Sequence, residues 1–248
     1  GNVWRFPYIT GQYGGAAFVV VYLFFLIVLG LPVMVMEYSV GRASQRSAAK
    51  SFDVLEPKGT KWHLMKYSCL VGNYLLMMFY TTICGWMLVY FIKMIMGDFN
   101  GLSTEQVSAE FNNMLANPLI QVGFMFIVVC IGFWVCSKGL QNGVEKISKY
   151  MMIALLAIML VLAVRSVTLN GAVEGIKFYL LPDFSKMVDS GFGEVVFAAM
   201  GQAFFTLSLG IGAIAIFGSY IDKERRLTGE AIQVVCLDTF VALVAGLI

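Results

Sequence analysis

Charged residues are scarce in this chain. Lys, Arg, Asp and Glu make up 13% of its 248 residues, whereas soluble globular domains carry about 25%. Hydrophobic residues make up 59%, and the mean hydropathy is +0.81. The core of one small domain cannot hold so many apolar side chains, so we expect a lipid bilayer to be their solvent. The net charge of +2 is too small to suggest a nucleic-acid partner.

Residues that often carry catalysis or bind transition metals are also few. The chain has one histidine, His63, and an odd number of cysteines without zinc-type spacing. We expect the cysteines to be buried as hydrophobic side chains and His63 to be solvated in a charged loop. The sequence has no HExxH, GxSxG or phosphate-loop motif, so we expect no enzyme. The cysteines are Cys69, Cys84, Cys130, Cys136 and Cys236.

Six apolar runs are long enough to cross a membrane, which takes about 20 helical residues. Residues 1–12 are too short to do so and are typical of the outer half of a helix. Both ends of the sequence fall inside apolar runs, so we expect it to be part of a longer chain. The predicted spans are 16–40, 67–96, 118–137, 147–167, 194–220 and 229–248.

Charge in the connecting loops predicts their orientation, because cytoplasmic loops are rich in Lys and Arg. Residues 41–66 hold six basic and two acidic side chains, whereas 97–117 holds three acidic and no basic ones. The first loop is therefore predicted to be cytoplasmic and the second external. By the same rule 138–146 and 221–228 lie inside and 168–193 outside. The external loops lack Asn-x-Ser/Thr sites, so we expect a multi-pass protein of a prokaryotic cell (inner) membrane.

Helix-weakening residues fall at the centre of one predicted span. The stretch AFFTLSLGIGAIAIF, residues 203–217, contains Thr206, Ser208, Gly210 and Gly212 at about mid-membrane depth. Glycine weakens helices, and hydroxyl side chains offer the backbone other partners. Unwound backbone at this depth is tolerated only where it is buried in protein or lines a cavity. The alternative is a face of small residues that packs against another helix.

Asp238 is predicted to lie at a similar depth. It follows Gly229 by nine residues, or roughly 13 Å of helix. A carboxylate there needs a cation, a proton or a ligand, or else a structural hydrogen bond to a neighbouring helix. Tyr80 and Arg5 also fall within or near apolar runs, where a core tyrosine and a snorkelling arginine are the simpler interpretations. A half-length helix, an interrupted helix and polar groups at the midplane are together typical of a secondary-transporter site.

The sequence resembles the neurotransmitter:sodium symporter family. The motifs that carry the resemblance are GNVWRFPY at 1–8, GGAAF at 14–18, KGLQNGVEKISKYMM at 138–152, FYLLPDFSKM at 178–187 and GQAFFTLSLGIGA at 201–213. The resemblance covers essentially the whole chain. It implies an all-α polytopic membrane protein with a five-plus-five inverted repeat and discontinuous first and sixth helices. One transporter core fragment would fill 1–248, with the outer half of helix 1 at 1–12, helices 2–5 at 16–167, broken helix 6 at 194–220 and helix 7 at 229–248.

The resemblance also implies roles for particular residues. The substrate would contact Gly1, Leu76, Tyr80, Phe205, Thr206, Ser208 and Ile211. A sodium ion would be held by Asn2, Thr206 and Asp238. The gates would contain Arg5 and Gln202 on the outer side and Tyr220 on the inner side. A chloride site, vestigial in this chain, would correspond to Tyr22, Gln202, Thr206 and Asp238.

One departure from the family pattern affects the expected ion coupling. Many members have asparagine at the position of Asp238, and an acidic side chain could replace the charge that chloride supplies. We therefore expect chloride-independent, sodium-coupled symport of a hydrophobic amino acid by alternating access, with proton antiport through Asp238 as an added hypothesis. Na⁺ is the only expected cofactor, and the lipid bilayer and the amino acid are the other partners. The alternatives are a non-transporting sensor or a channel on the same scaffold; the oligomeric state stays open.

Overall fold

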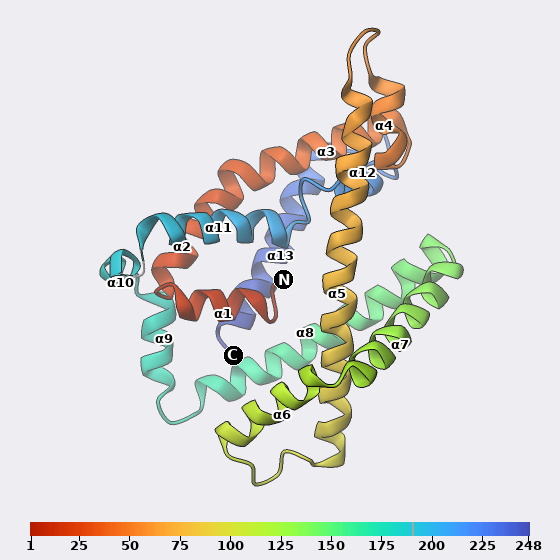
Figure 1. Cartoon of the computed structure of the whole chain (residues 1–248). Coiled ribbons are helices and arrows are strands. Elements are labelled where there is room, and N and C mark those ends of the chain that lie inside the picture. Colours follow the sequence, from red (N-terminus) through yellow and green to blue (C-terminus); the bar gives the residue numbers. More distant parts are fainter. Residues whose placement is uncertain (190) are drawn as a thin grey trace. The chain divides into compact units, whose positions relative to one another are not determined.

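The computed structural model describes residues 1–189 and 191–248, and every regular element in this part of the chain is helical (Figure 1). Its contacts divide the chain into two compact units. The first comprises Gly1–Leu70 and Ala154–Ile248, and the second comprises Val71–Ile153. The helices α5 (Met65–Met96) and α8 (Lys146–Val167) each contribute to both units.

Five stretches among the described residues are long and apolar enough to cross a membrane. They agree with five of the six runs predicted from hydropathy, with ends that differ by a few residues. The sixth predicted run, 194–220, is instead divided between a shorter apolar helix and a second short helix. The five stretches are Ala16–Ser44, Trp62–Met96, Pro118–Ser137, Gly143–Val167 and Leu227–Gly246.

The first span is built from three consecutive helical pieces. The α-helix α2 (Ala16–Phe25) passes through one π-helical stretch, η1 (Leu26–Gly30), into α3 (Leu31–Ser44). Phe18, Tyr22 and Leu26 on this span are buried in the core of the first unit, with Phe6 of α1 (Arg5–Gln12) against Tyr22 at a ring-centroid distance of 5.1 Å. The span is therefore the central support against which most of the other helices of the unit pack.

Helices α11 (Phe192–Thr206) and α12 (Ala213–Gly218) pack along this span, α11 on α2 and α12 on α3. Small residues allow α12 to approach α3 closely. A Cβ atom added to Gly218 would lie 2.6 Å from the carbonyl oxygen of Tyr38, and one added to Gly41 would collide with the carbonyl of Ala215. Such close contact between backbones is typical of helices that associate in membranes. Helix α13 (Leu227–Gly246) packs on α3 and on α1.

The second unit holds most of α5, then α6 (Thr104–Ala116), α7 (Pro118–Ser137) and the π-helical stretch η3 (Leu140–Glu145). Helix α6 begins with a capping box, in which Ser103 and Gln106 bond each other's backbone amides. Trp86 donates to Gln121 at 3.2 Å, and Lys93 pairs with Glu110 at 2.5 Å. These contacts connect α5 to α6 and α7.

Two expectations need correction. Segments expected to be plain loops contain helices α4 (Ala48–Leu55), α6, α9 (Ala172–Leu180) and α10 (Phe184–Asp189), because short helices have too few apolar residues to register as spans. Among the cysteines only Cys69 is buried, whereas Cys84, Cys130, Cys136 and Cys236 are exposed. The four exposed cysteines lie on the long apolar helices α5, α7 and α13.

Candidate functional site

The predicted interruption of the sixth apolar segment is present and has a clear hydrogen-bonding cause. Helix α11 ends at Thr206, and regular helix resumes at Ala213. In a continuing α-helix the amides of Leu209 and Gly210 would bond the carbonyls of Phe205 and Thr206. Instead Leu209 donates to the Phe204 carbonyl at 3.0 Å, and Gly210 donates to Oε1 of Glu37 at 2.6 Å. The Thr206 carbonyl therefore loses its regular helical partner.

The backbone between the two helices takes up left-handed conformations. The φ angle is +54° at Ser208, +85° at Gly210 and +72° at Gly212. A positive φ is uncommon for a residue other than glycine, and such residues are concentrated at functional sites. A Cβ atom on Gly212 would lie 2.5 Å from Cβ of Ala48 and 3.2 Å from Sγ of Cys69. Both the conformation and the lack of space therefore require glycine at 212.

Three polar side chains from distant parts of the sequence meet beside this break. Asn2 precedes α1, Thr206 ends α11, and Asp238 lies in the middle of α13. Asn2 Nδ2 donates to Asp238 Oδ1 at 2.6 Å and to the Asp238 carbonyl at 3.2 Å. The Thr206 hydroxyl lies 2.8 Å from Asp238 Oδ2 and also bonds Oδ1 of Asn2. We call these three residues the oxygen cluster.

The oxygen cluster fits a small hard cation. A threonine hydroxyl has one proton to donate, yet here it lies between two acceptor oxygens, Asn2 Oδ1 and Asp238 Oδ2. A cation among these oxygens would remove the conflict, and freed carbonyls at broken helices are known sodium ligands. The donors are amide, hydroxyl and carboxylate oxygens, with no thiolate or imidazole among them. This donor set suits a hard cation such as sodium better than a soft metal ion.

Arg5 lies beside the same break. Its Nη1 donates to Oε1 of Gln202 at 2.6 Å, and its guanidinium carbon is 4.6 Å from the ring centroid of Phe205. Gly1 is next to that ring, because a Cβ atom added to Gly1 would lie 3.7 Å from two atoms of Phe205. The structure thus brings together Gly1, Arg5, Gln202 and Phe205, four of the residues that the resemblance assigned to substrate binding and gating.

Two buried donors lie near this end of α11. Tyr22 and Gln202 are both fully buried; Nε2 of Gln202 has no hydrogen-bond partner among the described residues, and the Tyr22 hydroxyl, which lies near the Thr206 and Thr239 hydroxyls, makes no hydrogen bond of regular geometry there. An unpaired buried donor costs about 1–3 kcal/mol. Both residues belong to the set predicted for a chloride site, and unpaired donors are what a bound anion would use.

The contacts described above do not include every residue that the resemblance assigned to the site. Ser208 and Ile211 lie in the interrupted segment. Leu76 and Tyr80 lie on the part of α5 that belongs to the second unit, and their place in a substrate site stays a prediction. Tyr220 is 66% exposed after the end of α12 and makes no contact with the oxygen cluster in this structure.

Glu37 is the functional candidate that the sequence reasoning missed. Its carboxylate lies within the first span and holds the Gly210 amide. The available signal was an acidic residue inside an apolar run, since ionisable residues within membrane spans usually have a function. Its partner is 173 positions away, so sequence spacing gave no indication of what it binds.

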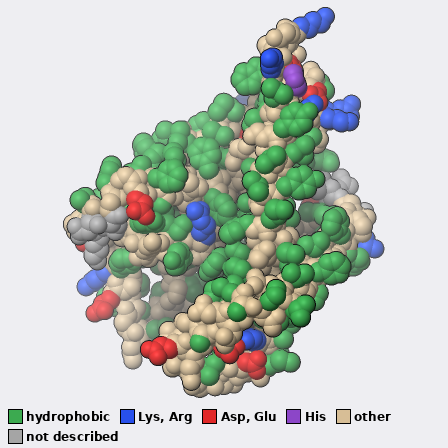
Figure 2. Space-filling view, viewed as in Figure 1, with side chains coloured by type: hydrophobic (Ala, Val, Ile, Leu, Met, Phe, Trp, Pro, Cys, Tyr) green, Lys and Arg blue, Asp and Glu red, His purple; other side chains and the backbone are tan. Residues whose placement is uncertain are grey.

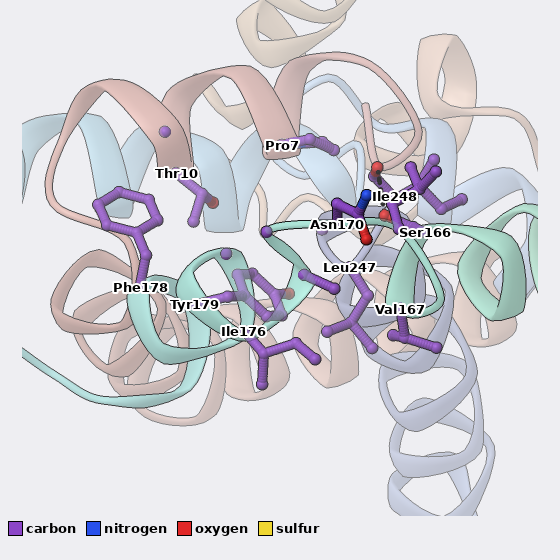
Figure 3. Close-up of a pocket in the computed structure, with 16 residues that line it drawn as sticks. Pro7, Thr10, Ser166, Val167, Asn170, Ile176, Phe178, Tyr179, Leu247 and Ile248 are labelled. Atoms are coloured by element: carbon purple, nitrogen blue, oxygen red, sulfur yellow. Dashed lines mark hydrogen bonds between the residues drawn. The ribbon is translucent and has the colours of Figure 1, made fainter.

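A separate pocket of about 360 Å³ lies between α1, the connection from α8 to α9, α9 itself and the end of α13 (Figure 3). Thr10, Asn170 and Tyr179 line it together with Leu247. None of the predicted substrate, sodium or gate residues lines this pocket. We therefore do not assign it to the substrate.

A bundle of apolar helices, broken midway beside a cluster of oxygen donors, defines the class of secondary transporters with discontinuous helices. The model of the Sodium:neurotransmitter symporter family matches residues 1–113 and 106–248. The chain belongs to that family, which confirms both the resemblance and the predicted fold class.

Individual relatives agree with this assignment. The chain is 35% identical over 247 residues to the uncharacterized sodium-dependent transporter YhdH of Bacillus subtilis, covering 100% of this chain and 54% of that protein. It is 31% identical to the sodium-dependent serotonin transporter of Drosophila melanogaster, covering 98% and 44%. The crystal structure of MhsT in complex with L-phenylalanine matches with a TM-score of 0.88 and 38% identity, covering 99% and 55%. The chain spans about half the length of these relatives.

Proposed function

We propose that the protein of which this sequence forms part carries an amino acid across the cell membrane by sodium-coupled symport. The observation that supports this most directly is the oxygen cluster of Asn2, Thr206 and Asp238 beside the interrupted helix. It offers a negative charge and hard oxygen donors at the point where the backbone is open. The relatives include a sodium-dependent transporter and a structure bound to L-phenylalanine.

In this proposal each part of the site has a separate task. Asp238 supplies the charge that attracts sodium, and Asn2 and Thr206 complete its oxygen shell. The Thr206 carbonyl, whose helical partner amide is held by Glu37, accepts the ammonium group of the substrate. Sodium and substrate both favour the closed arrangement of the same segment, so each raises the affinity for the other. The inward sodium gradient can then drive uptake.

The expected substrate is a hydrophobic amino acid. Leu76, Phe205 and Ile211, which we assign to the side-chain pocket, are apolar. Gly1 has no side chain, so its backbone amide is open to a carboxylate. A substrate amine without a carboxylate would leave the Gly1 amide without a hydrogen-bond acceptor. A hydrophobic α-amino acid satisfies both features.

We further propose that transport does not require chloride. The Asp238 carboxylate, when ionised, supplies a negative charge of the protein's own and accepts from Thr206 at 2.8 Å. The buried donors of Tyr22 and Gln202 would become a chloride site only when that charge is removed. Asp238 could also exchange a proton during the cycle.

Uptake of radiolabelled amino acids by the full-length protein in proteoliposomes tests the main proposal. We expect saturable accumulation against a gradient with an inward sodium gradient and little uptake when choline replaces sodium. A sensor would bind the amino acid without accumulating it, and a channel would equilibrate it without saturation. Competition by unlabelled amino acids should favour aliphatic and aromatic ones; accumulation that is independent of sodium would refute the proposal.

Replacing chloride by gluconate tests the ion coupling. Wild-type uptake should be unchanged, whereas Asp238→Asn should become dependent on chloride. Thr228→Val serves as the control, because Thr228 lies on the same helix α13, is exposed and is ten residues away from Asp238. Wild-type uptake that falls in gluconate would contradict chloride independence while leaving sodium coupling intact.

A further inference from the structure

The connection between the first two spans is folded and contains two short helices. It comprises residues 45–66, including α4 and the short 3₁₀-helix η2 (Trp62–Leu64). The face of α4 that carries Ala48 and Ser51 is buried, and Ser44 Oγ donates to Ser51 Oγ at 2.9 Å. The connection is therefore fixed to the end of α3, directly at the predicted cytoplasmic surface of the membrane.

Glu56 organises the second half of this connection. Its Oε2 lies 2.7 Å from Nδ1 of His63 and 3.3 Å from the His63 amide, and its Oε1 accepts from the Thr60 hydroxyl at 3.1 Å. The expectation that His63 is merely solvated is therefore wrong. These bonds tie the two ends of the loop 56–63 together.

Both acidic groups of the connection have partners within it. Glu56 hydrogen-bonds the His63 ring at 2.7 Å, and Asp53 forms an ion pair with Lys66 at 3.2 Å. Four cations remain exposed and have no hydrogen bond or ion pair from their side chains among the described residues. They are Arg46, Lys50, Lys58 and Lys61.

Exposed apolar side chains accompany these cations. Trp62 is 63% exposed and Val54 is 59% exposed, and Leu55 and Leu64 are exposed as well. Figure 2 shows blue and green side chains intermingled at the top of the view, where Figure 1 places α4 and the adjoining loop. Tryptophan and leucine next to lysine are typical of segments that lie in the interface of a membrane.

We infer that residues 45–66 form a binding surface for anionic phospholipid headgroups of the cytoplasmic leaflet. The four unpaired cations complement the negative lipid phosphates, and Trp62 and Val54 enter the boundary between headgroups and acyl chains. Loop charge that only sets orientation needs neither internal pairing of the acids nor exposed apolar neighbours. The inference concerns a surface apart from the oxygen cluster, so it can hold or fail independently of the proposed transport.

The test uses the full-length protein in phosphatidylcholine vesicles with Trp62 as the only tryptophan and the other tryptophans replaced by phenylalanine. Energy transfer from Trp62 to acceptor-labelled lipid gives the relative association of phosphatidylglycerol over phosphatidylcholine. We expect a preference for phosphatidylglycerol. Equal association of both lipids would overturn the inference.

Charge variants locate the surface. The triple variant Lys50→Gln, Lys58→Gln and Lys61→Gln should lower the preference at least about fivefold, the factor that one cation near an anionic membrane contributes. The matched control removes three lysines in or next to a second predicted cytoplasmic loop, 138–146: Lys138→Gln, Lys146→Gln and Lys149→Gln. It should change the preference by less than about twofold. An equal loss in both variants would show that overall charge is responsible and would overturn the inference.

Two further measurements do not depend on the folding of the glutamine variant. The triple Lys→Arg variant at the same positions should retain the preference, and choline chloride at high concentration should lower it in the wild type by screening the charges. Soluble glycerol phosphate should not displace the labelled lipid, because it lacks the acyl chains that meet Trp62. Complete displacement by glycerol phosphate would identify a site for free phosphate and would overturn the assignment to lipid.

Discussion

At the scale of single residues, the site depends on one hydroxyl shared by two acceptors. Thr206 lies between Asn2 and Asp238. Hydrogen bonds to charged groups contribute about 1.5–3 kcal/mol. A methyl group has about the same shape as the hydroxyl but cannot act as a ligand for a cation. We therefore expect sodium binding to depend on the Thr206 hydroxyl as much as on the Asp238 carboxylate.

Thr206→Val keeps the shape of the side chain and removes its oxygen. We expect the sodium concentration for half-maximal uptake to rise at least about tenfold, which corresponds to the lower part of that energy range. The measurement is the sodium dependence of amino-acid uptake in proteoliposomes. Thr228→Val is the control, because it makes the same substitution at an exposed position of α13, and it should change that concentration by less than about twofold. Equal effects of the two variants would remove Thr206 from the sodium site.

Tyr80→Phe tests a residue whose role comes from the resemblance alone. If the Tyr80 hydroxyl bonds the substrate carboxylate, its loss should weaken amino-acid binding by about 1–3 kcal/mol. Scintillation-proximity binding to the full-length protein measures this change. Tyr74→Phe on the same helix is the matched control, since Tyr74 is exposed. Unaltered affinity in Tyr80→Phe would place the carboxylate elsewhere.

At the scale of elements, helix α11 ends where side-chain chemistry competes with the helix. Glu37 takes the Gly210 amide, and left-handed residues at Ser208, Gly210 and Gly212 prevent the helix from continuing. The stretch Thr-Leu-Ser-Leu-Gly-Ile-Gly left an interrupted helix and a packing face of small residues both open, and the family resemblance favoured the interruption. The stretch was not enough to predict Glu37 as the partner, because that contact joins two helices far apart in sequence.

Two substitutions separate the hydrogen bond that Glu37 accepts from the Gly210 amide from the negative charge of its side chain. Glu37→Gln keeps a carbonyl oxygen that can accept from the Gly210 amide, whereas Glu37→Leu removes every acceptor. We expect Glu37→Leu to weaken amino-acid binding at least about tenfold, the effect of about 1.4 kcal/mol, because the freed amide can bond the Thr206 carbonyl again. Glu37→Gln should retain most of the affinity. Binding of labelled amino acid to purified full-length protein distinguishes the two variants, and an equal loss in both would show that the charge matters more than the hydrogen bond.

The helices differ in how readily the sequence predicts them. Apolar length alone located Pro118–Ser137 and Leu227–Gly246 within a few residues, since no other environment accommodates such runs. The short helices α4 and α9 were missed because their few apolar residues pack locally against α3 and α2. The oxygen cluster could be assembled only through the resemblance, because Asn2 and Asp238 are 236 positions apart.

At the scale of the whole molecule, function depends on which loops face the cytoplasm. The distribution of Lys and Arg predicts that 41–66 lies inside and 97–117 outside. The same orientation places the end of α1 toward the outside and the connection that carries α4 inside. Transport from outside to inside and lipid binding at the inner leaflet both require this arrangement, so a direct test of orientation bears on each of them.

Single cysteines can test this orientation in intact cells. In a full-length background without native cysteines, Ser103→Cys should react with a membrane-impermeant maleimide applied from outside, because residue 103 lies in the acidic loop predicted to be external. Lys58→Cys should react only after the cells are made permeable, because residue 58 lies in the basic connection. Residue 103 is exposed just before α6, and residue 58 is exposed after α4, so both thiols are accessible once the reagent reaches their side. The reverse pattern would invert the topology, and it would place the cationic surface of residues 45–66 against the outer leaflet rather than the inner one.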